Sequence, residues 1–220
     1  MLADDDSLRQ QQRALIEVHA GKVALESLDR ISPDLGALGP EHKFPLAQLA
    51  LPTLRLLESA ELARFLETLD ELVHADQRIS TFEFALQKLL TRGLSLGQSP
   101  KGGLIQLYSF NALILEIGVV LSALAQASTR DSAEARTAFE AGANQLKLIQ
   151  AQLSFDPKPF DFLLLDAALD KLATASAPIK QRTLLAAAHV ACSNGSVSVA
   201  EAELLRAIAA AFDVPIPPLA

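Results

Sequence analysis

Two segments far apart in the chain carry oxygen-bearing side chains at matching positions. The first begins with Asp76 and ends with Glu83, and the second begins with Asn194 and ends with Glu201. Such oxygens are the ligands that hard divalent cations prefer, so both segments are candidate metal sites, with His74 close to the first. Neither has the Asp-x-Asp-x-Asp-Gly pattern of an EF-hand, and the second has lost a charge at its first position. A structural role for these four residues is therefore favoured over metal binding.

The same segments contain a signal for the start of a helix. Each includes Ser-x-x-Glu, in which the Ser oxygen accepts from a backbone N–H of the first turn and the Glu accepts from the Ser N–H. The Asx residues ahead of these capping boxes are suited to end the preceding helix or hold the turn. Each segment is thus predicted to be a tight link between two helices, which makes the chain a duplicated helical unit. The boxes are Ser80 to Glu83 and Ser198 to Glu201.

No motif of enzymatic chemistry accompanies these links. His-Glu-x-x-His, the signature of zinc hydrolases, is missing because none of His19, His42, His74 and His189 is followed by Glu. A Gly-rich phosphate loop, a Ser nucleophile elbow and a redox Cys pair are also missing. Cys192 has a histidine one turn earlier, yet nothing completes a triad, and its Ala-rich surroundings indicate a buried thiol. We expect no catalytic residue and no cofactor in this chain.

Glu116 is unusual because it lies inside the strongly apolar segment 103–127. A buried carboxyl group must be paired or protonated. It could line a cavity for a ligand, or form a core ion pair with an arginine such as Arg55 or Arg64, and the ion pair is favoured.

The segment 103–127 is also long enough to cross a bilayer. It contains Gln106, Asn111, Glu116 and Gln126, which are costly in hydrocarbon. A buried central helix is therefore favoured over a membrane span.

The composition predicts an all-α protein. Half of the residues are apolar, only 5% are aromatic, and alanine and leucine dominate over β-branched residues. The net charge is −7 and the basic residues are scattered, so we expect no binding to nucleic acid. A single cysteine allows no internal disulfide, and no secretory signal is apparent at the start. Both observations favour the cytoplasm.

Apolar periodicity and breaker residues predict the order of the helices. One or two helices over 5–30 are followed by breaks at Pro33, Gly36, Gly39 and Pro40. A helix over 44–58 is then kinked or restarted at Pro52. The third helix has Ser59 as its N-cap and an apolar face through Leu62, Phe65, Leu66, Leu69, Leu72 and Val73. The helix after the first link ends at Gly93.

A loop at 93–103 is the best internal boundary, and the same order of helices then recurs. Asp131 opens a helix whose apolar face includes Phe139, Leu146, Ile149 and Leu153. A rigid corner over 155–160 leads to helices over 160–173 and from Ala177 onward, and a final helix follows the second link. The predicted segments are 1–43, 44–92, 93–157 and 158–220, with two helix-turn-helix units packed around a central apolar helix as one bundle.

Three stretches together resemble a known bacterial region. They are Phe44-Pro-Leu-Ala-Gln-Leu-Ala-Leu-Pro-Thr-Leu-Arg55, Asp76-Gln-Arg-Ile-Ser-Thr-Phe-Glu83, and Val199-Ala-Glu-Ala-Glu-Leu-Leu-Arg206 together with Pro215-Ile-Pro-Pro218. The chain resembles the C-terminal cytosolic region of HtpX-like membrane zinc metallopeptidases. Its links resemble the helical turns of TerB-like domains, where Ala-Asp-Gly is usual. This chain departs from that pattern at Gln77 and at Ser193-Asn194.

The resemblance implies a non-catalytic accessory or regulatory module on the cytosolic side of the inner membrane. Its partner would be a protein, either the peptidase domain or a substrate, and the chain would be an appendage of a longer enzyme. Two alternatives stay open: a free-standing TerB-like stress protein that binds a divalent metal, and a helical carrier of a hydrophobic ligand whose polar head meets Glu116. The sequence leaves the oligomeric state open.

Overall fold

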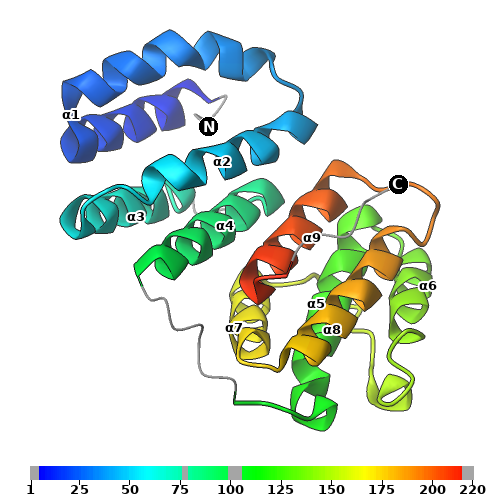
Figure 1. The fold of residues 1–220 in the computed structure, drawn as a ribbon. Coiled ribbons are helices and arrows are strands. Elements are labelled where there is room, and N and C mark those ends of the chain that lie inside the picture. The colour runs from blue at the N-terminus through cyan, green and yellow to red at the C-terminus, as the bar shows by residue number, and fades with distance from the viewer. Residues whose placement is uncertain (1–4, 76–78, 99–105, 215–220) are drawn as a thin grey trace. The chain divides into compact units, whose positions relative to one another are not determined.

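A computed structural model describes residues 5–75, 79–98 and 106–214. Within these ranges the regular elements are helices, apart from one isolated parallel bridge between Leu107 and Ala175, so the predicted all-α class is confirmed. The chain folds as two compact units, an N-terminal unit, Met1–Gln98, and a C-terminal unit, Ser99–Ala220 (Figure 1). This division falls inside the predicted boundary at 93–103. The finer division into four segments stays a prediction.

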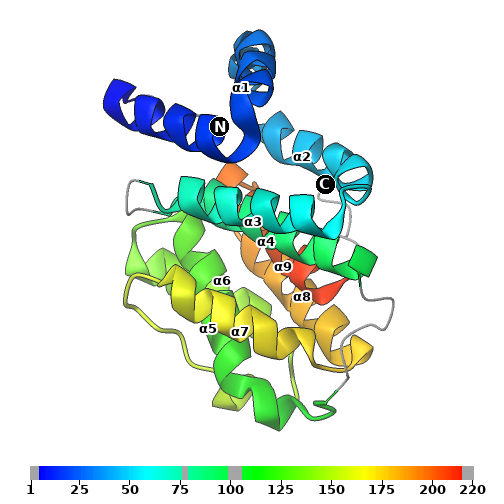
Figure 2. The same cartoon turned by 90° about the vertical axis from the view of Figure 1, so that its left-hand side faces the viewer.

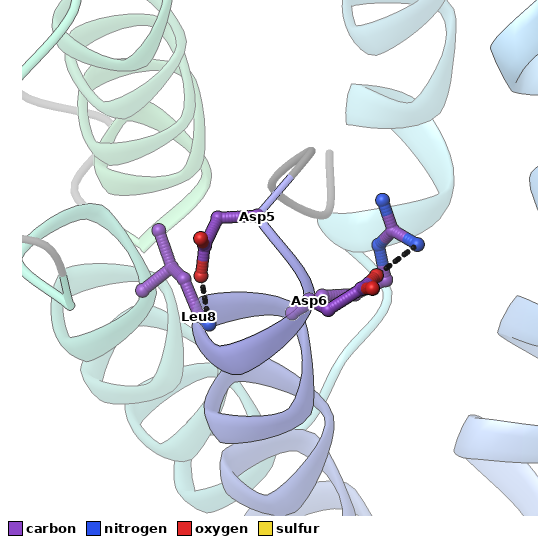
Figure 3. Close-up of polar contacts among 4 residues, drawn as sticks. Asp5, Asp6 and Leu8 are labelled. Carbon is purple, nitrogen blue, oxygen red and sulfur yellow. Dashed lines mark hydrogen bonds and ion pairs between the residues drawn. The ribbon is translucent and has the colours of Figure 1, made fainter.

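The N-terminal unit begins with α1 (Asp6–Ala37), which is two helices joined at Gly21. Gly21 has φ 81° and ψ 171°, a conformation that only glycine adopts without strain. Asp5 caps the first helix by accepting a hydrogen bond from the Leu8 N–H at 2.9 Å (Figure 3). The second helix continues through Pro33 to Ala37, so the break predicted at Pro33 and Gly36 was wrong. The predicted break at Gly39 is confirmed, because Leu38 and Gly39 separate α1 from the next helix, α2, which begins at Pro40.

Three further helices complete this unit: α2 (Pro40–Leu54), α3 (Ser59–Val73) and α4 (Thr81–Gln98). The sequence predicts a kink or a restart at Pro52, but α2 does not restart there and continues to Leu54. The N-cap of α3 is Glu58 rather than the predicted Ser59, and the Glu58 N–H donates to the carboxylate of Glu61. The apolar face predicted for α3 is confirmed, because Leu62 forms a buried cluster with leucines of α4. The cluster consists of Leu62, Leu90 and Leu94, with Leu51, Leu54, Leu57, Phe65, Leu66, Leu69 and Leu86 around it.

Gly93 does not end its helix, which corrects the prediction from sequence. It lies inside α4 where that helix packs against α2. A Cβ atom at Gly93 would lie 2.9 Å from Cδ2 of Leu51, and Arg55 Nε donates to the Gly93 carbonyl at 2.9 Å. Glycine at this position therefore allows α2 and α4 to pack closely, and it does not form a left-handed C-cap.

The C-terminal unit is built around α5 (Ile114–Ser128), which contacts α6 (Ser132–Ala143), α7 (Phe162–Ala173), α8 (Ala177–Ala191) and α9 (Val199–Phe212). Figures 1 and 2 show α7 running beside α5. A 3-10 turn, η1 (Phe110–Leu113), precedes α5, and another, η2 (Gln150–Gln152), follows α6. The stretch Phe110–Ser128 is long and apolar enough to cross a membrane, and half of its most apolar window is buried in this fold. In the structure α5 is a core helix, as predicted.

The segment between α6 and α7 differs in part from its prediction. Asp131 caps α6 as expected, accepting from the N–H groups of Ala133 and Glu134. The helix ends at Ala143, however, so Leu146 and Ile149 are buried by a series of turns rather than by a helix face.

The predicted corner at 155–160 is not helical. The side chain of Gln126, on α5, holds this corner: its amide donates to the carbonyls of Asp156 and Lys158 and accepts from the Phe160 N–H.

Candidate functional site

The two links contain the capping boxes that the sequence predicts. In the first, Glu83 Oε2 accepts from the Ser80 N–H at 2.9 Å and from its hydroxyl at 2.7 Å. In the second, Glu201 Oε2 accepts from the Ser198 N–H at 2.8 Å, and the Glu201 N–H donates to Ser198 Oγ at 3.2 Å. One box opens α4 and the other opens α9, so each unit contains one such link.

These contacts explain the candidate metal ligands structurally. Glu83 and Glu201 complete capping boxes, and Glu201 is only 1% exposed. Asn194 Oδ1 accepts from the Ser196 N–H at 3.1 Å and holds a turn that Gly195 continues at φ 81°. Asp76 lies outside the described residues. Among the residues that the structure describes, no three His, Cys, Asp or Glu side chains gather where a metal ion could bind them together.

Cys192 is exposed, which corrects the predicted buried thiol. The helix α8 ends at Ala191, and Cys192 is its C-cap, with its N–H donating to the Ala188 carbonyl. The alanine-rich pattern that indicated burial stops one residue before the cysteine. His189, one turn earlier, is also exposed.

Glu116 forms an ion pair, but not with the predicted Arg55 or Arg64. Its Oε1 lies 2.5 Å from Nζ of Lys171, which joins α5 to α7. The Glu116 side chain is 15% exposed and that of Lys171 is 47% exposed. Glu116 Oε2 is buried and has no hydrogen-bond partner among the described residues. A structural ion pair therefore accounts for this carboxylate.

A groove that the sequence did not predict lies on the surface of the C-terminal unit. It has a volume of about 270 Å³ and combines apolar and basic side chains. Leu148 and Leu185 are 75% and 49% exposed, and both lie at this one hollow. We call it the Leu148–Leu185 groove. Its lining consists of Phe110, Gln145, Leu146, Lys147, Leu148, Ile149, Arg182 and Leu185.

Three elements position these side chains. After α6, successive turns bury Leu146 and Ile149, at 4% and 2% exposure, and this anchoring leaves Lys147 and Leu148 facing solvent. On α8, Arg182 and Leu185 are three residues apart and so share one face of the helix. Their neighbours Thr183, Leu184 and Ala186 point into the core. Phe110 of η1 completes the groove.

The charge of the groove is opposite to that of the chain. Its described lining contains Lys147 and Arg182 and no carboxylate, whereas the whole chain has a net charge of −7. Neither cation forms an ion pair within the described parts of the C-terminal unit. Both are exposed and therefore available to a partner.

A second hollow, of about 310 Å³, lies where α6 begins, beside the corner at 155–160. Two of its polar side chains already have structural tasks: Asp131 caps α6, and Gln126 binds the corner backbone. The Leu148–Leu185 groove is therefore the better candidate site. Comparison with protein-family models, with curated proteins and with solved structures gave no match for this chain.

Proposed function

We propose that this chain is a non-catalytic protein-interaction module, an accessory or regulatory part of a bacterial membrane-bound zinc metallopeptidase on the cytosolic side. The observation that supports an interaction role is the Leu148–Leu185 groove, where two exposed leucines and two exposed cations surround an apolar hollow. Exposed apolar groups around a hollow with a polar rim are typical of protein-binding surfaces. The link to a metallopeptidase rests on the sequence resemblance.

The groove favours a protein partner over a carried hydrophobic ligand. Pockets for small ligands typically bury most of the ligand surface. The groove is open at its edge, where Leu148 is 75% and Leu185 49% exposed, so it would leave much of a carried ligand in contact with water. In that alternative, Glu116 would contact the polar head of the carried ligand. Glu116 is paired with Lys171 and does not line this groove.

A direct binding measurement tests the proposal. The labelled chain is titrated with a detergent-solubilised HtpX-like peptidase that lacks its own C-terminal region, and the cleavage rate of a model substrate is followed in parallel. We expect saturable binding and a changed rate. Burying a leucine side chain is worth about 1.5–3 kcal/mol, so Leu148→Asp with Leu185→Asp should weaken binding at least about tenfold.

Leu163→Asp is the matched control, because Leu163 is 73% exposed but lies on α7 and does not line the groove. This variant should bind like the unchanged chain. Absence of binding by the unchanged chain would reject the metallopeptidase as partner.

A further inference from the structure

We propose that the Leu148–Leu185 groove binds a short peptide segment that carries an apolar side chain next to one or more carboxylates. This inference rests on the proposed function, because it names the chemistry of the partner that such an interaction module would recognise. Three features of the molecule support it: the shape of the groove, its two cations and the charge of the rest of the chain.

The shape of the groove suits the insertion of a side chain. Leu146 and Ile149 form a buried floor, and the exposed leucines Leu148 and Leu185 lie at its edge. An apolar side chain placed there would cover leucine surface that water now contacts, which is the main source of affinity at protein interfaces. A flat bilayer surface cannot enter a hollow of this kind, so a peptide is favoured over a membrane.

The two cations select for negative charge. Lys147 belongs to the turns after α6 and Arg182 to α8, so a carboxylate bound between them would contact both elements. The guanidinium of arginine matches the two oxygens of a carboxylate, and such charge-assisted hydrogen bonds are stronger than neutral ones. Because the described lining has no acidic residue, a carboxylate entering the groove would meet no repulsion from it.

The net charge of −7 does not prevent this recognition. At physiological ionic strength, electrostatic interactions between exposed charges are screened beyond about 8 Å. Distant carboxylates of the chain therefore repel an acidic peptide only weakly, whereas the contacts with Lys147 and Arg182 are short-ranged. High salt should weaken binding of the acidic peptide, because it screens the attraction to Lys147 and Arg182. At low salt, the attraction to these two cations and the repulsion from distant carboxylates should both become stronger.

The experiment is fluorescence polarisation of the full chain with three labelled short peptides. The first contains leucine flanked by glutamates, the second has lysines in place of the glutamates, and the third has serine in place of leucine. We expect the first to bind and the other two to bind at least about tenfold more weakly. The basic peptide loses charge-assisted hydrogen bonds, and the serine peptide loses the burial of a leucine side chain. Equal binding of the acidic and basic peptides, or no binding of the acidic one, would overturn the proposal.

A charge swap makes the test specific for the groove. Arg182→Glu should weaken binding of the acidic peptide at least about tenfold and strengthen binding of the basic peptide. Lys158→Glu is the control, because Lys158 is exposed, in the same unit and outside the lining. Both sites are on the surface, so the circular dichroism of either variant should match that of the unchanged chain. If Arg182→Glu changes the affinity for neither peptide, the groove is not the binding site.

Three further outcomes separate this inference from the proposed function. Binding to phosphatidylcholine–phosphatidylglycerol vesicles that Arg182→Glu abolishes, without peptide binding, would make the groove a membrane contact and overturn the inference. Peptidase binding that Arg182→Glu leaves intact, again without peptide binding, would overturn the inference but keep the proposed function. Peptide binding without peptidase binding would support the inference and reject the metallopeptidase.

Discussion

At the scale of single residues, Glu116 and Lys171 form a partly buried ion pair whose removal should be measurable. Lys171→Met leaves the Glu116 carboxylate, which is 15% exposed, without its partner. Breaking a fully buried pair costs about 3–5 kcal/mol. Since Lys171 is 47% exposed, we expect a loss nearer about 1–2 kcal/mol in urea unfolding.

The control for this pair is Lys158→Met, which changes an exposed lysine with no ion pair in the described chain. The double variant Glu116→Leu with Lys171→Met should be more stable than Lys171→Met alone, because no buried charge is left. An unfolding midpoint for Lys171→Met equal to that of the control would contradict this account.

A substitution at Thr183 should raise the free energy of unfolding, whereas Lys171→Met should lower it. Thr183 is fully buried in α8, and its hydroxyl oxygen has no hydrogen-bond partner among the described residues. Thr183→Val keeps the shape and removes the unsatisfied hydroxyl, so it should stabilise the fold by about 1 kcal/mol in thermal or urea unfolding. Thr137→Val is the comparison, because Thr137 is exposed and its hydroxyl donates to the Ala133 carbonyl. A stability loss at Thr183 would show that its hydroxyl has a partner.

At the scale of elements, the contact between α6 and α8 depends on Gly142. A Cβ atom at this position would clash with Cγ2 of Val190 and would lie 2.7 Å from the backbone carbonyl oxygen of Ala186. A backbone carbonyl cannot move aside without shifting α8, so Gly142→Ala should destabilise the protein by about 1–3 kcal/mol in urea unfolding.

Gly36→Ala is a suitable control for Gly142→Ala. Gly36 also lies within a helix, and a Cβ atom there would meet nothing within 4 Å. Alanine should therefore stabilise its helix by about 0.5–1 kcal/mol. Equal effects of the two substitutions would mean that α6 and α8 are farther apart in solution than in this structure.

The two halves of α1 are joined by an ion pair whose contribution to stability should depend on pH. Arg13 donates two hydrogen bonds to Asp29, the one from Nη2 to Oδ2 measuring 2.8 Å, across the break at Gly21. These bonds lower the pKa of Asp29 below its ordinary value. The stabilisation is therefore present above the unfolded-state pKa and is lost as the pH falls through the lower folded-state pKa.

The measurement for this pair is an NMR titration of the Asp29 carboxyl group. In the unchanged chain its pKa should be below the ordinary value, and in Arg13→Gln it should return to that value. An identical pKa in both proteins would mean that the two halves of α1 are not joined by this contact in solution.

The elements that could be predicted from sequence are those with local signals. The boxes at Ser80 and Ser198 and the cap at Asp131 depend on residues three positions apart, so the sequence is sufficient to place those helix starts. The prediction at Gly93 was wrong because a glycine at a helix end and a glycine at a helix crossing look alike until Leu51 of another helix is placed beside it. The prediction at Cys192 was wrong because the helix stops just before it.

The Leu148–Leu185 groove could not be predicted for a related reason. Its walls come from η1, from the turns after α6 and from α8, which only the tertiary fold brings together. The predicted continuous helix has Leu146 and Ile149 on its apolar face but not Leu148, because residues two apart point to different faces of a helix. The helix α6 ends at Ala143 instead, so turns bury Leu146 and Ile149, and the exposed Leu148 becomes part of a hollow only because η1 and α8 lie beside it. An apolar residue just beyond a helix end is therefore a position where a surface site can arise without a sequence signal.

At the scale of the whole molecule, the two units differ in how much apolar surface they bury. Of the buried apolar side chains in the described residues, eight lie in the N-terminal unit and thirty-two in the C-terminal unit. Burial of apolar area is the main favourable term in folding, so the C-terminal unit should be the more stable. Its helices also share one central element, α5, whereas in the N-terminal unit the helices pack in series: α1 against α3, α3 against α4, and α4 against α2.

Native-state hydrogen exchange measures this difference in the intact chain. Amides of α5, α8 and α9 should exchange only through the unfolding step with the largest free energy. Amides of α1 should exchange through local unfolding that has a much smaller free energy. Residues 99–220 expressed alone should keep a cooperative unfolding transition, because their core does not need the cluster around Leu62. Equal protection in α1 and α5, with loss of cooperativity in the shorter chain, would mean that the two units fold only together. Retained cooperativity would instead allow the groove and its peptide to be studied on the C-terminal unit alone.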